Sequence, residues 1–238
     1  MQIFIEDNYE AMCKKGSELI ASAIKENPNI VLGLATGSTV VGVYKDLVEK
    51  YERKEIDFSG VTTFNLDEYV GINPDDEKSY HSYMKDVLFS KTNVDIKNTF
   101  FPSDYSEDYS KFEDKIEILG GIDLQVLGIG GNGHIGFNEP GSSFGSRTRE
   151  ITLTAGTIKD NARFFNSEDD VPKKAATMGM GTIMAARRIV FFANGEKKKD
   201  IVKKALQGSV TEDIPASVLQ NHKNVIIILD KEAASELE

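Results

Sequence analysis

The sequence is poor in cysteine and has no long apolar run. Cys13 is the single cysteine among 238 residues, so an intramolecular disulfide is excluded. No apolar run approaches the roughly 20 residues that cross a bilayer, and the opening MQIFIEDNYE lacks the basic and apolar parts of a secretory signal. We therefore expect a cytoplasmic protein of a reducing compartment, with no membrane partner.

An excess of positive charge is also missing. The chain has 28 Lys and Arg against 38 Asp and Glu, which gives a formal net charge of −10. Nucleic-acid binding requires a strongly basic face, so we expect no nucleic-acid partner. An anionic small molecule is still compatible with this charge, because a few local cations can hold it against the overall field.

Short apolar segments alternate with segments of helical periodicity along the chain. The expected strands are Ile3–Ile5, Asn29–Leu34, Val61–Asn65, Ile122–Ile129, Ile151–Thr154, Ile189–Ala193 and Val225–Leu229. The expected helices are Tyr9–Lys25, Thr39–Tyr51, Ser79–Phe89, Tyr105–Leu119, Ala175–Ala186 and Lys197–Leu206. The strand segments are apolar throughout, which indicates a parallel sheet covered by helices on both faces. We predict an α/β fold, a single domain over residues 1–238 with three layers around a mostly parallel central sheet.

Sheets of this kind bind ligands at the carboxyl ends of their strands. The loops that follow Leu34, Asn65, Ile129 and Ala193 are therefore the places where we expect functional residues. In this interpretation all four lie along one edge of the sheet, where their side chains can reach a common ligand.

The segment LGIGGNGHIGFNEPG contains three glycines, Gly128, Gly130 and Gly133, with the spacing G-x-G-x-x-G. A dinucleotide-binding fingerprint needs a helix directly after the third glycine. Here Asn138, Pro140 and further glycines and serines follow, and they disfavour a helix. We expect the glycines to allow a sharp reversal and close backbone approach, and we expect no nucleotide or other cofactor.

Two residues of this loop suit proton transfer. Histidine is the side chain best suited to move a proton near pH 7, and Glu139 could orient the ring of His134. The alternative is a surface loop with a solvated histidine. We expect no metal, because the pair lacks zinc-motif spacing and the other histidines, His81 and His222, have no ligand-like neighbours.

Asp67 and Glu68 stand just past the end of the Val61–Asn65 strand, in the segment FNLDEYV. Paired carboxylates in a turn are usually solvated or cap that turn. The functional alternative is a general base held close to a substrate carbon. An aspartate with its ordinary pKa of about 3.9 is already ionised at neutral pH, so this role requires no unusual pKa of Asp67.

The loop LGLATGST joins a strand to an expected helix, and its backbone N–H groups and hydroxyls suit a phosphate group. Its candidate phosphate-binding residues are Thr36, Gly37, Ser38 and Thr39. The alternative is that Ser38 or Thr39 caps the helix, and both can hold at once. No G-K-[ST] follows, so this is not a nucleotide P-loop. Arg163 and Lys197 could complete an anion site, although each alone is typical of a surface charge.

Five segments of the chain carry a family resemblance. They are LGLATGST, TFNLDEYVGI, GGNGHIGFNEPGSSFGSRTR, ARFF and VPKKAATMGMGTI, in this order over nearly the whole chain. Together they resemble the glucosamine-6-phosphate deaminases of the glucosamine/galactosamine-6-phosphate isomerase family. The resemblance implies a Rossmann-like fold without a nucleotide. It also implies conversion of glucosamine 6-phosphate and water to fructose 6-phosphate and ammonia, in amino-sugar catabolism and N-acetylglucosamine utilisation.

The resemblance also implies catalytic roles. By similarity, His134 assists opening of the sugar ring, supported by Glu139 and Asn132. Asp67 then removes the proton from C2 and helps deliver it to C1 through an enolamine. The resulting ketose imine is hydrolysed, which releases ammonia.

The substrate phosphate has its own residues by similarity. They are the loop Thr36–Thr39 together with Arg163 and Lys197. Residues from roughly 148 to 174 resemble the mobile lid of the family. The phosphate does not react, and its binding energy would position C2 over Asp67.

The chain departs from the family at several positions. Many relatives have an aspartate where this chain has Asn132, which can donate a hydrogen bond but cannot change charge. Ser38 replaces a glycine seen in some relatives. Arg149 matches part of a pocket for the activator N-acetylglucosamine 6-phosphate, but Ile151 stands where a lysine is expected. We therefore expect weak or absent allosteric activation.

Two other functions and the oligomeric state stay open at this level. A 6-phosphogluconolactonase shares the fold and a Gly–His loop, but lactone hydrolysis would not need Asp67 or Glu139. A sugar-phosphate sensor of a transcription regulator would carry a DNA-binding helix-turn-helix, for which we see no room before Ile30. The family includes monomers and homo-oligomers.

Overall fold

The computed structural model describes residues 1–162 and 165–238. A seven-stranded sheet forms its centre, with strand order β1-β10-β9-β6-β2-β3-β5, and every neighbouring pair is parallel. Its strands are β1 (Gln2–Glu6), β2 (Val31–Leu34), β3 (Thr62–Asn65), β5 (Thr99–Phe100), β6 (Leu124–Leu127), β9 (Arg188–Ala193) and β10 (Val225–Asp230). The prediction of an α/β fold around a mostly parallel sheet is confirmed.

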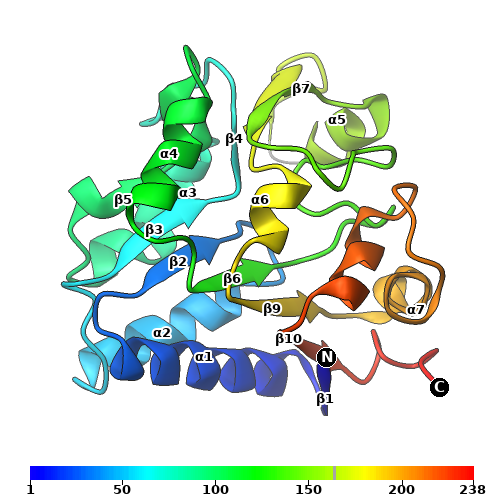
Figure 1. Cartoon of the computed structure of the whole chain (residues 1–238), viewed down its shortest axis with the longest axis horizontal. Coiled ribbons are helices and arrows are strands. Elements are labelled where there is room, and N and C mark those ends of the chain that lie inside the picture. The colour runs from blue at the N-terminus through cyan, green and yellow to red at the C-terminus, as the bar shows by residue number, and fades with distance from the viewer. Residues whose placement is uncertain (163–164) are drawn as a thin grey trace.

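Helices cover both faces of this sheet. Figure 1 shows α1 (Tyr9–Glu26) and α2 (Val41–Glu52) along one face, and α4 (Ser110–Ile118) and α6 (Met180–Met184) on the other. The other described α-helices are α3 (Tyr80–Val87), α5 (Ala155–Asn161) and α7 (Lys199–Gln207). Strands β2, β6 and β10 are buried at every position, as the continuous apolar runs indicate. In the described part of the chain no helix combines the length and apolarity needed to cross a membrane.

A second, antiparallel sheet lies beside the first. It consists of β4 (Asp67–Tyr69), β8 (Lys174–Thr177) and β7 (Arg149–Thr152), in the order β4-β8-β7. Two predictions are wrong here, because Asp67 and Glu68 lie in a strand instead of a turn, and the predicted helix Ala175–Ala186 begins as strand β8. The segment KAAT of β8 pairs with β4 on one side and β7 on the other. This long-range pairing overrides the helix propensity of its alanines.

Several predicted helices begin later than expected. Helix α2 begins at Val41 instead of Thr39, α4 at Ser110 instead of Tyr105, and α7 at Lys199 instead of Lys197. The short 3-10 turns are η1 (Phe89–Lys91), η2 (Ile96–Asn98), η3 (Pro102–Tyr105), η5 (Glu196–Lys198) and η6 (Pro215–Asn221). Two of them, η3 and η5, occupy residues near the starts of α4 and α7. Helix ends commonly vary by a residue or two, which accounts for α2 and α7. Helix α4 begins five residues later because η3 occupies the chain up to Tyr105.

Candidate active site

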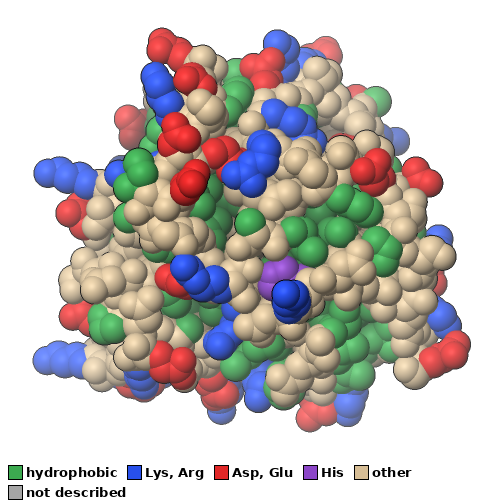
Figure 2. Space-filling view, viewed as in Figure 1, with side chains coloured by type: hydrophobic (Ala, Val, Ile, Leu, Met, Phe, Trp, Pro, Cys, Tyr) green, Lys and Arg blue, Asp and Glu red, His purple; other side chains and the backbone are tan. Residues whose placement is uncertain are grey.

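The four loops singled out in the sequence lie at one edge of the central sheet, because all of its strands run in the same direction. Figure 2 shows a histidine side chain near the middle of the face, over β6 and β9 in the view of Figure 1. Lys or Arg side chains lie beside it. This combination of a proton-transfer group and cations suits an anionic substrate.

The glycine-rich loop after β6 is a compact turn built around His134. The N–H of Gly130 donates to the carbonyl of His134 at 3.0 Å, and the N–H of Gly133 donates to the carbonyl of Gly130 at 3.1 Å. A Cβ atom at Gly130 would overlap the His134 ring, so glycine is required there to make room for the imidazole. The next regular element after this loop is β7, not a helix, so the structural context of a dinucleotide fingerprint is missing.

Glu139 lies at the centre of a hydrogen-bonded group in the same loop. Nδ2 of Asn132 donates to its Oε2 at 2.7 Å, and the hydroxyl of Thr157 donates to Oε1. Nδ1 of His134 lies 3.7 Å from Oε2, close enough for charge attraction but too far for a hydrogen bond. Burial alone would raise the pKa of Glu139, but the His134 ring, Thr157 and Asn132 outweigh it and lower that pKa to about 2. Glu139 is therefore ionised beside His134.

Strand β4 directs Asp67 toward this loop. The side chain is only 6% exposed, and a Cβ built on Gly136 would lie 3.1 Å from its Oδ2. Within residues 1–162 and 165–238, no hydrogen-bond donor contacts the Asp67 carboxylate. The predicted base and the predicted histidine loop are thus brought together.

The pKa of Asp67 lies far above the ordinary value of an aspartate. Burial, assisted by the neighbouring Glu68 carboxylate, raises the pKa of Asp67 to about 8. The cause is strand β4, which places the carboxyl inside the protein and not in a solvated turn. A carboxyl group with this pKa can both release and accept a proton near neutral pH.

The loop between β2 and α2 contains the predicted phosphate-binding residues. Gly37 has φ +112, a conformation that favours glycine, and it turns the chain into α2. The N-cap residue of α2 is Val40, and no side chain caps the helix, so the alternative interpretation of Ser38 or Thr39 as the cap is wrong. The carbonyls of Gly37 and Ser38 accept hydrogen bonds from Tyr83 and Tyr9 at 3.0 and 2.9 Å. The loop is thus held from outside by two tyrosines, and its hydroxyls are not used as caps.

The sequence predicts two cations for the phosphate site, Arg163 and Lys197. Arg163 lies outside the described residues. Lys197 lies in η5 with an exposed side chain. Its neighbour Lys198 is partly buried and donates from Nζ to the carbonyl of Ile129 at 2.8 Å, at the start of the loop that carries His134. The structure thus brings Lys198 into contact with this loop and leaves Lys197 exposed, a difference that the run of three lysines could not reveal.

The sequence interpretation missed the surroundings of His81. In the structure its ring lies between the carboxylates of Glu68 and Asp104, at 3.0 and 3.1 Å. These three residues are far apart in sequence, and only the packing of α3 against β4 and η3 brings them together. In the described ranges, no group of three or more His, Cys, Asp or Glu side chains has the arrangement of a metal site.

Part of the segment 148–174 contacts the site directly. Thr157 of α5 donates to Glu139, and Nδ2 of Asn161 donates to the hydroxyl of Tyr69 in β4 at 2.9 Å. A hollow of about 350 Å³ adjoins Glu139, and its lining also includes Ser142, Arg149 and Ile151. Arg149 donates to Oδ1 of Asn138 at 2.9 Å. Helix α5 thus contacts the loop that carries Glu139.

Comparison with known proteins gives a consistent set of relatives. The family model described as glucosamine-6-phosphate isomerases/6-phosphogluconolactonase matches residues 6–228. A glucosamine-6-phosphate deaminase of Thermoanaerobacter sp. is 52% identical over 239 residues, which cover 99% of this chain and 94% of that protein. One of Alkaliphilus oremlandii is 50% identical over 241 residues, with 100% of each chain covered. A solved structure described as a monomeric glucosamine-6-phosphate deaminase is 43% identical, with a TM-score of 0.95 over 99% of this chain and 100% of that chain.

Proposed function

The chain belongs to the glucosamine-6-phosphate isomerase/6-phosphogluconolactonase family, and we propose that it converts glucosamine 6-phosphate and water to fructose 6-phosphate and ammonia. Relatives of about 50% identity over the full chain carry the name of this deaminase. The chain is thus an enzyme acting on an amino-sugar phosphate. One observation supports the proposal most directly: the buried carboxylate of Asp67 lies against Gly136, in the loop that also carries His134 and Glu139.

In the proposed first step, His134 moves a proton from the C1 hydroxyl to the ring oxygen, which opens the sugar ring. The imidazolium formed in passing is stabilised by the ionised Glu139, 3.7 Å away. Nδ2 of Asn132 donates to Glu139 at 2.7 Å, and Oδ1 of Asn132 accepts from the backbone N–H of His134 at 3.2 Å. Asn132 therefore supports both members of the pair through hydrogen bonds and without a charge of its own.

In the second step, Asp67 takes the proton from C2 of the open-chain sugar, and the substrate's own ammonium group gives a proton to the C1 oxygen. This leaves an enolamine, and protonation of its C1 by Asp67 produces the ketose imine. Water adds to C2 of the imine and ammonia leaves. The substrate's ammonium group favours the ionised form of a neighbouring carboxyl, so substrate binding prepares Asp67, whose pKa is about 8 in its absence, to act as the base.

The phosphate group, which does not react, anchors the sugar. We assign it to the loop Thr36–Thr39 and to Lys198, and Arg163 and Lys197 remain candidates from the sequence. The partly buried ammonium of Lys198 supports this assignment, because it reaches Ile129 beside the glycine-rich loop. Fixing the phosphate converts its binding energy into correct placement of C2 over Asp67.

We further propose that residues 148–174 act as a lid on the 1–238 domain. Thr157 of this segment contacts Glu139, and Asn161 contacts Tyr69 in the strand of Asp67. Closure would exclude water from the enolamine. Amide hydrogen exchange over this segment, slowed when a non-reacting substrate analogue is added, is the expected sign of such a lid.

The reaction is tested by release of ammonia from glucosamine 6-phosphate, with the N-acetyl form as a control that has no free amine. We expect stoichiometric ammonia and fructose 6-phosphate from the first and none from the second. Opening of 6-phosphogluconolactone without ammonia release would favour the lactonase alternative. Binding of the sugar phosphate without turnover would favour a sensor.

The biological setting follows from the chemistry. We propose that the chain acts in amino-sugar breakdown, including N-acetylglucosamine utilisation, in the cytoplasm where sugar phosphates are retained. The solved relative is described as monomeric, and we propose the same state for this chain. Light scattering of the purified protein at micromolar concentration should give a mass close to 26.3 kDa.

A further inference from the structure

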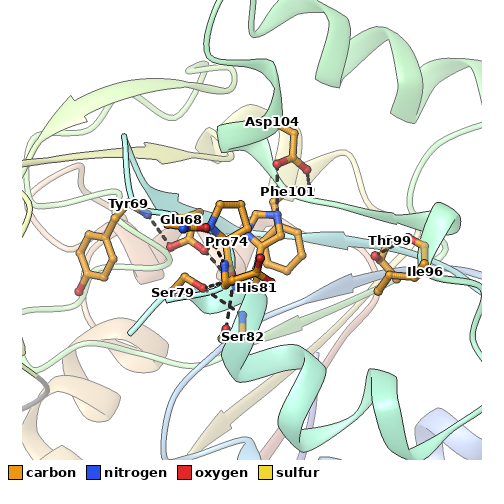
Figure 3. Close-up of polar contacts among 12 residues, drawn as sticks. Glu68, Tyr69, Pro74, Ser79, His81, Ser82, Ile96, Thr99, Phe101 and Asp104 are labelled. Carbon is orange, nitrogen blue, oxygen red and sulfur yellow. Dashed lines mark hydrogen bonds and ion pairs between the residues drawn. The ribbon is translucent and has the colours of Figure 1, made fainter. Parts of the chain in front are cut away.

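A second charged cluster lies behind Asp67, formed by Glu68, His81 and Asp104 (Figure 3). We call it the His81 cluster. Nδ1 of His81 lies 3.0 Å from Oε2 of Glu68, and Nε2 lies 3.1 Å from Oδ1 of Asp104. The ring stacks on Phe101, with centroids 3.6 Å apart and planes 24° from parallel. Since both ring nitrogens face carboxylates, both must carry protons, and His81 is an imidazolium.

Glu68 is the most deeply buried member of the cluster, with 1% of its side chain exposed. Its Oε1 accepts from the backbone N–H of Tyr69 at 2.8 Å, and its Oε2 accepts from the backbone N–H of His81 at 3.0 Å. Burial opposes a charge on His81, but the bonds to Asp104 and Glu68 outweigh it and raise the pKa of His81 to about 9. The buried Glu68 charge is thus matched by a cation and by two backbone donors, as a buried carboxylate requires.

The cluster is connected to the proposed base through strand β4. Successive side chains of a strand point to opposite faces, so Asp67 faces Gly136 while Glu68 faces α3. Figure 3 shows Glu68 pointing toward His81 and the Tyr69 ring pointing away from it. The cluster therefore attaches β4 to the first turn of α3 and, through Asp104, to η3.

The groups around Asp67 limit which charges can act on it. Glu68 is the charged neighbour that acts on Asp67. Tyr80 of α3 and Tyr69 of β4 also face this region, but burial raises the pKa of Tyr69 to about 12 and holds the pKa of Tyr80 well above its usual value. Both phenols are neutral over the working pH range. From the other side Asp67 meets Gly136, and Thr177 of β8 pairs with it.

We propose that His81 is a positioning residue, which holds Glu68 in place as an ion and thereby fixes both the location and the charge balance of Asp67. The inference rests on the proposed role of Asp67 as the base. Without the imidazolium, the two neighbouring carboxylates would lose the cation that offsets Glu68. Glu68 accepts from two backbone N–H groups, whereas Asp67 accepts from no donor in the described residues. Asp67 is therefore the carboxylate that would take up a proton when the imidazolium is removed.

The first test compares the pH dependence of kcat/KM in two variants. His81→Gln should move the acid limb of the profile to higher pH, by roughly one pH unit, the scale on which a neighbouring charge moves a carboxyl pKa. Glu68→Gln removes the negative charge beside Asp67 and should move the same limb to lower pH. His222→Gln is the matched control, because among the described residues the His222 ring bonds only to Ala186 and Asn224, and its profile should match wild type.

Opposite shifts in the two variants support the proposal, whereas a uniform loss of rate with unmoved limbs would overturn it in favour of a purely structural role. A second readout does not depend on catalysis. Nitrogen-15 NMR of the three histidine rings should show one ring that stays charged through pH 8, and its signal should vanish in His81→Gln.

If that variant does not fold, the ring is assigned by elimination with His222→Gln and His134→Gln. A His81 ring that loses its charge below pH 7 would also overturn the inference. Failure of the proposed function would appear separately, as a wild-type protein that releases no ammonia.

Discussion

Gly136 lies directly against the carboxylate of Asp67, because a methyl group added at Gly136 would sit 3.1 Å from Oδ2 of Asp67 and 3.2 Å from Oγ1 of Thr177. Gly136 also has φ +57, a backbone conformation that side chains other than glycine adopt at a cost. The loop that carries His134 thus approaches strand β4 as closely as a bare backbone allows. Glycine at this position is what lets the two halves of the proposed site share one sugar.

Gly136→Ala should damage activity more than stability. The backbone conformation costs about 1–2 kcal/mol for a non-glycine residue, whereas displacement of Asp67 by a fraction of an ångström to 1 Å can cost on the order of 10²-fold in rate. Steady-state kinetics and thermal melting separate the two effects. Gly141→Ala is the matched control, because Gly141 has φ +89 with no atom near its added methyl. Equal activity loss in both variants would contradict the proposed contact.

Asp67→Asn should abolish exchange of the C2 proton with solvent while leaving substrate binding nearly intact. An amide cannot accept the C2 proton, and loss of a general base costs about 10²–10⁴-fold in rate. Deuterium incorporation in D₂O, followed by NMR, measures the exchange, and calorimetry measures binding. Asp114→Asn, an exposed change on α4, should behave as wild type. Full exchange activity in Asp67→Asn would mean that the base is another residue.

The same substitution should stabilise the protein at pH 8. The pKa of Asp67 rises from an ordinary value of about 3.9 to about 8 on folding. The contribution of Asp67 to stability is therefore fully present below about pH 4 and is lost as pH rises through about 8. Asparagine does not ionise and avoids this loss. We expect Asp67→Asn to melt a few degrees above wild type at pH 8, at about 2–4 °C per kcal/mol for a protein of this size. The difference should shrink toward pH 4, and a Tm offset independent of pH would contradict burial of an ionisable group.

Lys198→Met should raise KM for the sugar phosphate, while Lys197→Met should leave it nearly unchanged. Loss of a hydrogen bond to a charged group costs about 1.5–3 kcal/mol, which corresponds to roughly a ten- to hundredfold increase in KM. The two adjacent lysines differ in exposure and in the Ile129 contact, so each serves as the other's control. Inhibition by inorganic phosphate should weaken in parallel in Lys198→Met. A raised KM in Lys197→Met with an unchanged KM in Lys198→Met would instead assign the phosphate contact to Lys197.

Much of the fold could be predicted from local patterns. Continuous apolar runs such as Val225–Leu229 indicated strands buried on both faces, and parallel sheets place their loops at a common edge. His134, Glu139 and Asp67 were singled out because their residue types suit proton transfer and they follow strands. These features depend on residues close together in the chain, which is why the sequence contains them.

The tertiary structure decided what depends on distant residues. Pairing of β4 with β8 turned a predicted helix and a predicted turn into strands, and the same pairing buried Asp67 and raised its pKa. The tertiary structure also placed the partly buried Lys198 against Ile129 and left Lys197 exposed, and the packing of α3 placed His81 between Glu68 and Asp104. The charge state of a side chain and the atoms it contacts depend on which elements pack around it. Those contacts form only when segments far apart in sequence pack together.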